Sequence, residues 1–316
     1  MSRSDPEASL QDEAARAGWM YYVGGKTQDQ IATELGVSRQ RAQRLVSRAM
    51  TDGLVHVRLE HKIAACLVLE AELTRRFGLC EVRVAPSLGD GGDPTRAIAG
   101  VGAGLMEKYL RRTEPLIMAL GTGRALRACA DEMLPITAEQ HRIVSLIGNI
   151  APDGSASFYD VIIRISDRVR APHFPMPVPV ISDTAAERAM FQRLRPAQIV
   201  FDLAKAADVT FVGVGQMGDD APLLLDGFVS APDLAEMQAL GATGEIAGWV
   251  FDAQGKYIET CLSDRLGSAR LEPNRPAPVI GIAAGLRKVR ALKAALEGHI
   301  INGLVTDEAT AQALLI

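Results

Sequence analysis

Short apolar runs, several of them followed at once by glycine, recur along most of this chain and constrain its fold more than any other feature of the sequence. The runs have the length of buried strands, and helical segments follow several of them. This alternation predicts an α/β fold with a doubly wound, mostly parallel sheet covered by helices on both faces. The predicted strands are 116–120, 143–147, 178–181, 208–212, 279–283 and 304–306; the predicted helices are 125–133, 286–296 and 307–315; and an antiparallel hairpin is predicted at 246–259, turning at 252–255.

Glycine-containing loops at the ends of four predicted strands form a candidate ligand site. Ligands of parallel sheets bind at the carboxyl ends of the strands, where glycine lets the backbone come close, although a tight turn is the alternative interpretation of each loop. The first loop also opens a helix, so its amides and Arg124 favour an anion. Its sequence GTGRAL matches neither the dinucleotide fingerprint nor the P-loop, so no nucleotide cofactor is predicted. The candidate residues are Gly121, Thr122, Gly123, Arg124, Gly148, Asn149 and Lys288, with the loop 213–216 on the same rim.

Glu245 is the acidic residue with the clearest candidate role. It precedes an apolar strand and can accept hydrogen bonds from ligand hydroxyls. A carboxylate at the edge of a hairpin is an equally good interpretation of this position.

Near the N-terminus the sequence has the pattern of two helices joined by a sharp turn. Thr27, followed three residues later by Gln30, is a capping box, and Ser38 is the cap expected for the next helix. Gly36 supplies the positive φ that a tight helix-to-helix connection requires. The predicted helices are 28–35 and 39–51.

Flanking segments complete a small N-terminal module. An apolar segment predicts a helix at 14–23, and an alternating segment predicts a short strand at 54–60. Three helices and a strand, with a glycine turn before the last helix, are typical of a winged helix-turn-helix. We therefore expect a winged helix-turn-helix domain at 1–60 and the α/β domain at 61–316, led by a linker helix at 62–77.

The helix predicted at 39–51 carries an exposed face without acidic residues. Its apolar residues fall at helical spacing and form a buried stripe, so the opposite face is polar and basic. The whole chain has a net charge of −4, yet residues 14–60 contain seven basic and four acidic side chains. Arg and Gln can read base edges in the major groove, while Arg, Ser and Thr can bind phosphates. The candidate DNA-binding residues are Thr27, Ser38, Arg39, Gln40, Arg41, Gln43, Arg44, Ser47 and Arg48, whereas the stripe is Ala42, Leu45, Val46, Ala49 and Met50.

Two alternatives to DNA binding remain open for this module. Its basic face can simply be solvated, as in a small helical bundle, or the module can serve protein contact alone.

The remaining cysteines, histidines and acids show no metal or catalytic spacing. The four cysteines at 66, 80, 129 and 261 predict buried free thiols in a reducing compartment. The histidines at 56, 61, 141 and 299 lack metal spacing, His173 is predicted to lie in a loop, and Asp307 with Glu308 is interpreted as a helix cap. Neither a signal peptide nor an apolar run of about 18 residues is recognisable. We therefore expect a cytoplasmic protein without metal or cofactor.

Five segments resemble the SorC family of sugar-binding bacterial transcriptional regulators. They read TQDQIATELGVSRQRAQRLVSRAMTDGLV, ALGTGRAL, DVTFVGVGQMG, GEIAGWVFDAQGK and VIGIAAGLRKVRALKAALEGHIINGLVTDEATAQALL, and they span nearly the whole chain. The resemblance implies an operator-binding domain followed by an effector domain similar to the glucosamine-6-phosphate deaminase and ribose-phosphate isomerase group. It also implies a homodimer or homotetramer and a sugar, polyol or sugar-phosphate effector. The stretch GNIAPDGSASFYDVIIRISDRV is similar to the erythritol-catabolism regulator branch, which implies a short polyol.

The resemblance also implies roles for single residues. It implies that the loop 121–124 binds the phosphate or terminal hydroxyl of the ligand, that Glu245 binds carbohydrate hydroxyls and that Lys288 pairs with phosphate. Two positions depart from the family pattern. Members often carry Thr or Ser where this chain has Ala125, which removes a hydroxyl donor, and they often carry Asp where it has Glu245.

These features favour a DNA-binding transcriptional regulator, such as a repressor, of carbohydrate or polyol catabolism. Its operator binding would be controlled by a small effector in the C-terminal domain. The alternative is a sugar-phosphate isomerase or deaminase with an appended regulatory domain. That enzyme needs a positioned general base, for which only Glu245 and Asp307 are candidates, and no catalytic set emerges around them. We therefore expect no enzymatic activity.

Overall fold

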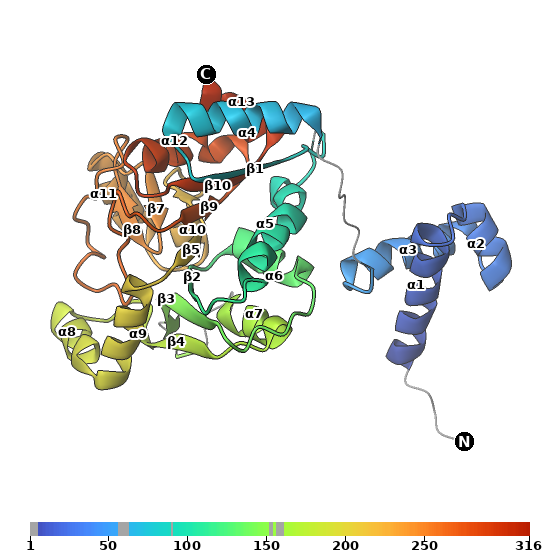
Figure 1. Cartoon of the computed structure of the whole chain (residues 1–316), viewed down its shortest axis with the longest axis horizontal. Helices are drawn as coiled ribbons and strands as arrows, with labels where there is room; N and C mark the ends of the chain where they lie inside the picture. The colour runs from blue at the N-terminus through green and yellow to red at the C-terminus, as the bar shows by residue number, and fades with distance from the viewer. Residues whose placement is uncertain (1–5, 56–62, 90, 152–153, 156–160) are drawn as a thin grey trace. The chain divides into compact units, whose positions relative to one another are not determined.

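The chain forms two units, Met1–His61 and Lys62–Ile316, and each is described here by itself. The computed structural model describes residues 6–55, 63–89, 91–151, 154–155 and 161–316. The described part of the first unit is helical, whereas the second combines helices with two sheets (Figure 1).

Local signals in the sequence set the helix boundaries of the N-terminal unit. Thr27 accepts a hydrogen bond from the backbone of Gln30 and donates its own N–H to the Gln30 side chain, so the predicted capping box is present. Gly36 has a φ of 65°, and Ser38 caps the following helix. Both predicted helix boundaries are therefore confirmed. The helices are α1 (Pro6–Tyr22), α2 (Gln28–Leu35) and α3 (Arg39–Thr51).

Side chains from all three helices form the core of this unit. The stripe predicted on α3 is buried except for Met50, which is half-buried. α1 begins at Pro6, earlier than the predicted start at residue 14. Most of the strand predicted at 54–60 lies outside the described residues, and Leu54 and Val55 are not in a strand, so the wing stays a prediction. The core residues are Ala14, Ala17, Ile31, Ala32, Ala42, Leu45, Val46 and Ala49.

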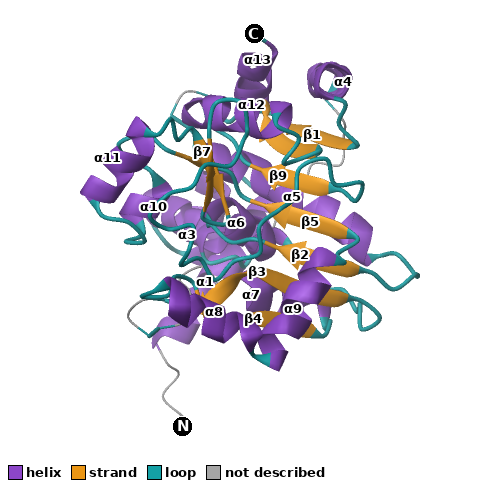
Figure 2. Cartoon of the chain, turned by 90° about the vertical axis from the view of Figure 1, so that its left-hand side faces the viewer, coloured by secondary structure: helices purple, strands orange, loops and turns teal. Residues whose placement is uncertain are grey.

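A seven-stranded parallel sheet runs through the C-terminal unit (Figure 2). The strand order is β1-β10-β9-β5-β2-β3-β4, and each pair of neighbours is parallel. The predicted parallel α/β fold is therefore confirmed. The strands are β1 (Glu81–Ala85), β2 (Ile117–Leu120), β3 (Arg142–Ile150), β4 (His173–Pro179), β5 (Val209–Val212), β9 (Val279–Ile282) and β10 (Gly303–Asp307).

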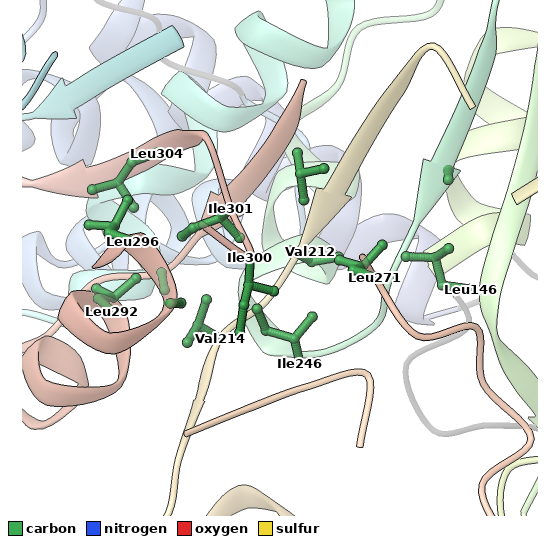
Figure 3. Packing of buried hydrophobic residues seen from close by; sticks show 14 of the residues in the cluster. Leu146, Val212, Val214, Ile246, Leu271, Leu292, Leu296, Ile300, Ile301 and Leu304 are labelled. Atoms are coloured by element: carbon green, nitrogen blue, oxygen red, sulfur yellow. The ribbon is translucent and has the colours of Figure 1, made fainter. Parts of the chain in front are cut away.

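Helices cover both faces of this sheet, and each face has its own core. Phe211 and Val305 belong to one core, while their chain neighbours Val212 and Leu304 belong to the other, because successive side chains of a strand point to opposite faces. Figure 3 shows part of the core around Val212 and Leu304. The first face is covered by α5 (Pro94–Leu110), α6 (Arg124–Glu132) and α7 (Val161–Val169), and the second by α4 (Ala64–Phe77), α9 (Arg195–Lys205), α12 (Val289–Glu297) and α13 (Glu308–Leu315).

Residues 215–267, here called the cap, form a smaller antiparallel sheet with a core of its own. The predicted hairpin is present, but its strands pair around a turn at Ala247, earlier than predicted. The predicted turn at 252–255 also exists, because the Gly255 N–H donates to the carbonyl of Asp252 and Phe251 bridges to Tyr257. The cap elements are β6 (Gly215–Gln216), α10 (Pro222–Leu225), α11 (Ala231–Ala239), β7 (Gly244–Ile246) and β8 (Trp249–Phe251).

The predictions were wrong at the last strand of the sheet, β4. His173 begins this strand and does not lie in a loop, and the predicted strand at 178–181 overlaps only its end. The segment contains three prolines, at 175, 177 and 179, and proline is unfavourable inside a sheet, so the sequence did not predict a strand here. Among the described strands β4 pairs only with β3, so prolines at alternate positions can face the open edge without removing a ladder hydrogen bond.

Several helices and one strand were not predicted from the sequence. They are β1, α5, α7, α9 and α8 (Ala185–Arg193). The predicted linker helix is present as α4, which buries Cys66, Leu69 and Leu73 and leaves Leu67 40% exposed.

Candidate functional site

Three of the predicted loops meet around one cavity. They follow β2, β5 and β9, which are neighbours in the sheet, so their carboxyl ends lie side by side. A Cβ added to Gly213 would lie 3.2 Å from the carbonyl oxygen of Thr122, which shows how closely the first two loops approach. The cavity has a volume of about 560 Å³ and is lined by these loops, the start of α5 and parts of the cap.

The loop after β2 forms an anion cradle at the start of α6. Gly123 precedes the helix with a φ of 118° and offers no side-chain cap, so the first amides of α6 are available to a ligand. Arg124 lies beside them with 55% of its side chain exposed, and its Nη2 is 3.1 Å from a carboxylate oxygen of Asp226. A phosphate or carboxylate at this place would meet backbone donors and a guanidinium.

The loop after β9 brings a second cluster of positive charge. The Lys288 ammonium donates to the carbonyl oxygen of Val214 at 2.8 Å, and Arg287 forms an ion pair with Asp220. The loop itself is fixed from the C-terminal helix, because the Gly285 N–H donates to Thr310 Oγ1 at 2.7 Å. All of Gly285, Arg287 and Lys288 line the cavity.

Glu245 approaches the cavity from the cap. Its Oε2 accepts a hydrogen bond from the Gly248 N–H at 2.8 Å, and burial raises the pKa of this carboxyl, with the charge of Lys288 acting in the opposite direction. Burial likewise lowers the pKa of the Lys288 ammonium, against the effect of Glu245. A carboxylate and an ammonium that line the same cavity can together accept from and donate to ligand hydroxyls.

The structure brings most predicted effector residues together. Six of them line the cavity: Gly121, Thr122, Gly123, Arg124, Glu245 and Lys288.

Gly148 and Asn149 are not among the lining residues, so their predicted place was wrong. The strand β3 continues through both, to Ile150. A Cβ on residue 148 would lie 2.5 Å from the carbonyl carbon of Pro179, so glycine is needed there for the approach of β4. Ile147 lines the cavity from this strand instead.

Other lining residues were missed in the sequence. Thr95 follows Asp93 and Pro94, an N-cap and first-turn proline whose signal could have marked the start of α5. Asp220, Asp226 and the apolar residues of the cap carry no local signal, because they reach the cavity only through the tertiary fold.

The histidines and Asp307 have structural roles or lie elsewhere. His141 is buried, where Nδ1 accepts from the Leu116 N–H at 3.2 Å and Nε2 lies 3.1 Å from the carbonyl oxygen of Leu110. Asp307 caps α13 by accepting from the Thr310 N–H, as interpreted from the sequence, and does not line the cavity. His56 and His61 lie outside the described residues. The part of the chain that the structure describes contains no cluster of potential metal ligands.

The cysteines are less uniformly buried than predicted. Cys66 and Cys129 are buried, but Cys261 is half-buried and Cys80 is exposed. The expectation of four buried thiols is therefore wrong for two of them. No helix among the described residues combines the length and apolar character needed to cross a membrane.

The basic face predicted on α3 is exposed in the N-terminal unit. Gln40, Arg41, Gln43, Arg44 and Ser47 are all exposed, and Arg48 is half-buried. The hydroxyls of the predicted contacts Thr27 and Ser38 cap α2 and α3. Several arginines make ion pairs within the unit, Arg39 with Asp29, Arg41 with Glu13 and Arg48 with Asp52. Ion pairs at the surface, such as those of Arg39 and Arg41, are weak and can be exchanged for phosphate contacts.

Comparison with known proteins relates the whole chain to bacterial regulators. Residues 61–316 match the family model of a sugar-binding domain. The erythritol catabolism regulatory protein EryD of Brucella abortus is 34% identical over 312 residues, covering 99% of this chain and 98% of EryD. The transcriptional regulator LsrR of Klebsiella pneumoniae is 33% identical, covering 95% of this chain and 92% of LsrR. The full-length sorbitol operon regulator SorC from Klebsiella pneumoniae superposes with a TM-score of 0.73 at 27% identity, covering 99% of this chain and 100% of SorC.

Proposed function

Because the chain belongs to the SorC family of sugar-binding transcriptional regulators, we propose that its cavity binds a carbohydrate effector that changes the affinity of its N-terminal unit for operator DNA. The relatives found are transcriptional regulators, so the chain is a sugar-responsive regulator and not a sugar-phosphate isomerase.

One observation supports the effector site: the uncapped start of α6, with Arg124, lines the same cavity as Lys288 and Glu245. The helix start and Arg124 suit a phosphate or another anion, while Glu245 and Lys288 suit hydroxyls or a further phosphate oxygen. A sugar phosphate or polyol phosphate has both kinds of group. EryD is named for erythritol catabolism, so erythritol and its phosphate are the first ligands to test.

The surface that would bind operator DNA is the exposed face of α3. Gln40 and Arg44 lie along the centre line of this face, opposite the buried stripe of the helix. They can reach base edges if α3 enters the major groove. Their neighbours Arg41, Gln43 and Arg48 would contact phosphates. The hydroxyls of Thr27 and Ser38 are engaged in helix caps, so we assign these two residues a backbone-positioning role through their helix starts.

We further propose that the protein acts as a homodimer or homotetramer. A symmetric pair of α3 helices would read two half-sites spaced by roughly one helical turn of DNA, about 10 base pairs, or a multiple of it. An effector that favours one subunit arrangement would then change operator affinity, and a coupling free energy of about 1–3 kcal/mol is typical of such linkage.

A thermal-shift screen of polyols, sugars and their phosphates tests the effector site. A ligand that raises the melting temperature of the wild-type protein should fail to do so in Arg124→Gln, and it should change binding to DNA selected by the protein from its own genome. If every hit stabilised Arg124→Gln as much as the wild type, the proposed cradle would be wrong.

A further inference from the structure

The cavity has a polar side, which holds its cationic side chains, and a second side, which β3 and the segment after β4 line with apolar residues alone. The polar side is made by the loops after β9, β5 and β2, which carry Lys288 and Arg124. The apolar side is made by residues of β3, of the segment after β4 and of the cap. It consists of Ile147, Val180, Ile181, Phe228, Leu262 and Leu266.

The strand order separates these two sides in space. β2, β3 and β4 are successive neighbours at one end of the sheet, so the apolar wall lies one to two strand spacings beyond the anion cradle. With a spacing of about 4.8 Å between strands, the far wall is displaced by roughly 10 Å from the loop after β2. Ile181 bridges to Leu266, which joins the edge of the sheet to the cap at this wall.

A short polyol phosphate does not fill this space. The three C–C bonds of a four-carbon polyol are roughly 1.5 Å each, so its carbon chain spans less than about 5 Å. Held at Arg124 by its phosphate and at Glu245 by its hydroxyls, it would leave Ile147 and Val180, at the side of the sheet beyond β2, without a partner. Apolar surface that lines a pocket favours apolar groups of a ligand, because their transfer from water is favourable.

We propose that the effector of this protein is amphipathic: an anionic, hydroxyl-rich head bound at the Arg124 cradle carries an alkyl or aryl group that packs between Ile181 and the cap. The proposal rests on the proposed effector site and extends it by naming a class of ligand, an apolar derivative of a sugar or polyol phosphate. The apolar group would contact both the sheet edge and the cap core, since Ile181 packs against both.

A phosphomonoester series separates the two sides of the cavity. The affinities of inorganic phosphate, butyl phosphate, hexyl phosphate and octyl phosphate for the full-length protein are measured by calorimetric titration, because a chain of more than four carbons is needed to reach the apolar wall from the cradle. Each buried methylene increases affinity by roughly fourfold, so two methylenes that reach the apolar wall should strengthen binding about fifteenfold, and octyl phosphate should bind at least that much more tightly than butyl phosphate. Arg124→Gln should weaken all four by a similar factor.

Variants locate the apolar group. Ile181→Thr keeps the β-branched shape and should remove the dependence on chain length while leaving phosphate binding intact. Ile199→Thr on α9 is the matched control, because Ile199 is 47% exposed and does not line the cavity. Val180→Thr serves as a second variant if circular dichroism shows that Ile181→Thr is misfolded.

The results distinguish a failure of the apolar site from a failure of the anion cradle. The proposal is supported if the affinity increases with the length of the alkyl chain in the wild type and in Ile199→Thr but not in Ile181→Thr. If phosphate binds but hexyl and octyl phosphate bind no more tightly than butyl phosphate, or if Ile181→Thr and Val180→Thr keep the full dependence of affinity on chain length, the apolar site is wrong and the anion cradle stands. If none of the four compounds binds, the cradle is wrong and the proposal is overturned with it.

Discussion

The carboxylate of Glu245 lies directly against the α-carbon of Gly215. The two residues face each other in the register of β6 and β7, and a Cβ added to residue 215 would lie 2.8 Å from the carboxyl carbon and overlap Oε1. Glycine at position 215 is therefore what allows Glu245 to face the cavity from the cap.

Replacing Gly215 by Ala should displace the Glu245 carboxylate and weaken effector binding. The expected loss is about tenfold or more, since hydrogen bonds to charged groups contribute roughly 1.5–3 kcal/mol. Operator DNA binding without effector should be unchanged. Titration of the best screened ligand measures the first effect, and fluorescence anisotropy with labelled DNA measures the second.

Gly104→Ala is the matched control for this substitution. Gly104 lies in α5 with nothing within 4 Å of an added Cβ, so alanine should leave effector affinity unchanged and stabilise the helix by up to about 1 kcal/mol. Equal losses of affinity in both glycine variants would refute the steric explanation.

Removing the charge of Lys288 should raise the pKa of Glu245 further. Burial already raises this pKa above its ordinary value of 4.5, and the positive charge of Lys288 opposes the shift. In Lys288→Met the carboxyl should therefore titrate at higher pH, measured by NMR of its labelled side-chain carbon and assigned by its disappearance in Glu245→Gln. Lys256→Met, at an exposed turn, is the control and should leave the titration in place.

The raised pKa of Glu245 also predicts how stability depends on pH. Between the ordinary value and the raised one, the folded protein keeps a proton that the unfolded chain has released, so this residue lowers the free energy of unfolding as pH rises through that interval. Glu245→Gln should reduce that decrease. Denaturant unfolding at a series of pH values checks the sign, and a steeper decrease in the variant would contradict it.

The turn between α2 and α3 should depend on the backbone freedom of Gly36. Its φ is 65°, and an added Cβ would meet nothing within 4 Å, so the cost of alanine comes from conformation alone. Gly36→Ala should destabilise the N-terminal unit by about 1 kcal/mol, and Gly36→Asn should cost less, because Asn adopts left-handed conformations more readily.

Trp19 allows this effect to be measured in the full chain. The sequence contains two tryptophans, so a Trp249→Phe background leaves Trp19 of α1 as the reporter of the N-terminal unit. Equal destabilisation by Ala and Asn would contradict a conformational cause.

Thiol alkylation should separate the four cysteines into two classes. Burial raises the pKa of Cys66 to about 11 and that of Cys129 to about 12, and the reactive species is the thiolate, so both should resist iodoacetamide at pH 8. Cys80 is exposed and Cys261 half-buried, so these two should react first. Peptide mass spectrometry before and after unfolding in guanidinium tests the order; early labelling of Cys129 would contradict the packing of α5 on α6.

The sequence predicted those elements of the fold that are determined by interactions between residues close together in the chain. The caps at Thr27 and Ser38, the turn at Gly36 and the apolar strands of the sheet interior all lie within short windows. By contrast, α5 is rich in glycine and alanine and has little periodic contrast. Its small residues serve close packing, since a Cβ on Gly102 would lie 2.5 Å from the sulfur of Cys129.

The candidate site was predictable only where a strand ends in a loop. The loops after β2, β5 and β9 met this condition, but β3 runs past Gly148, so the expected polar loop there is part of a strand. The apolar wall depends on Leu262 and Leu266 of the cap, which approach Ile181 through tertiary contacts that no short window of sequence contains.

Operator binding by the α3 face is the most direct test of the whole account. DNA fragments selected by the full-length protein from its own genome are titrated by fluorescence anisotropy with the wild type, with Gln40→Ala combined with Arg44→Ala, and with Arg124→Gln, each with and without the effector found by the screen. The account predicts that the α3 double variant falls to non-specific affinity with a folded C-terminal unit, a loss of at least tenfold, since each base contact contributes about 1–3 kcal/mol. Arg124→Gln should bind the same DNA as the wild type but no longer respond to the effector. Undiminished binding of the selected DNA by the α3 double variant would contradict the account.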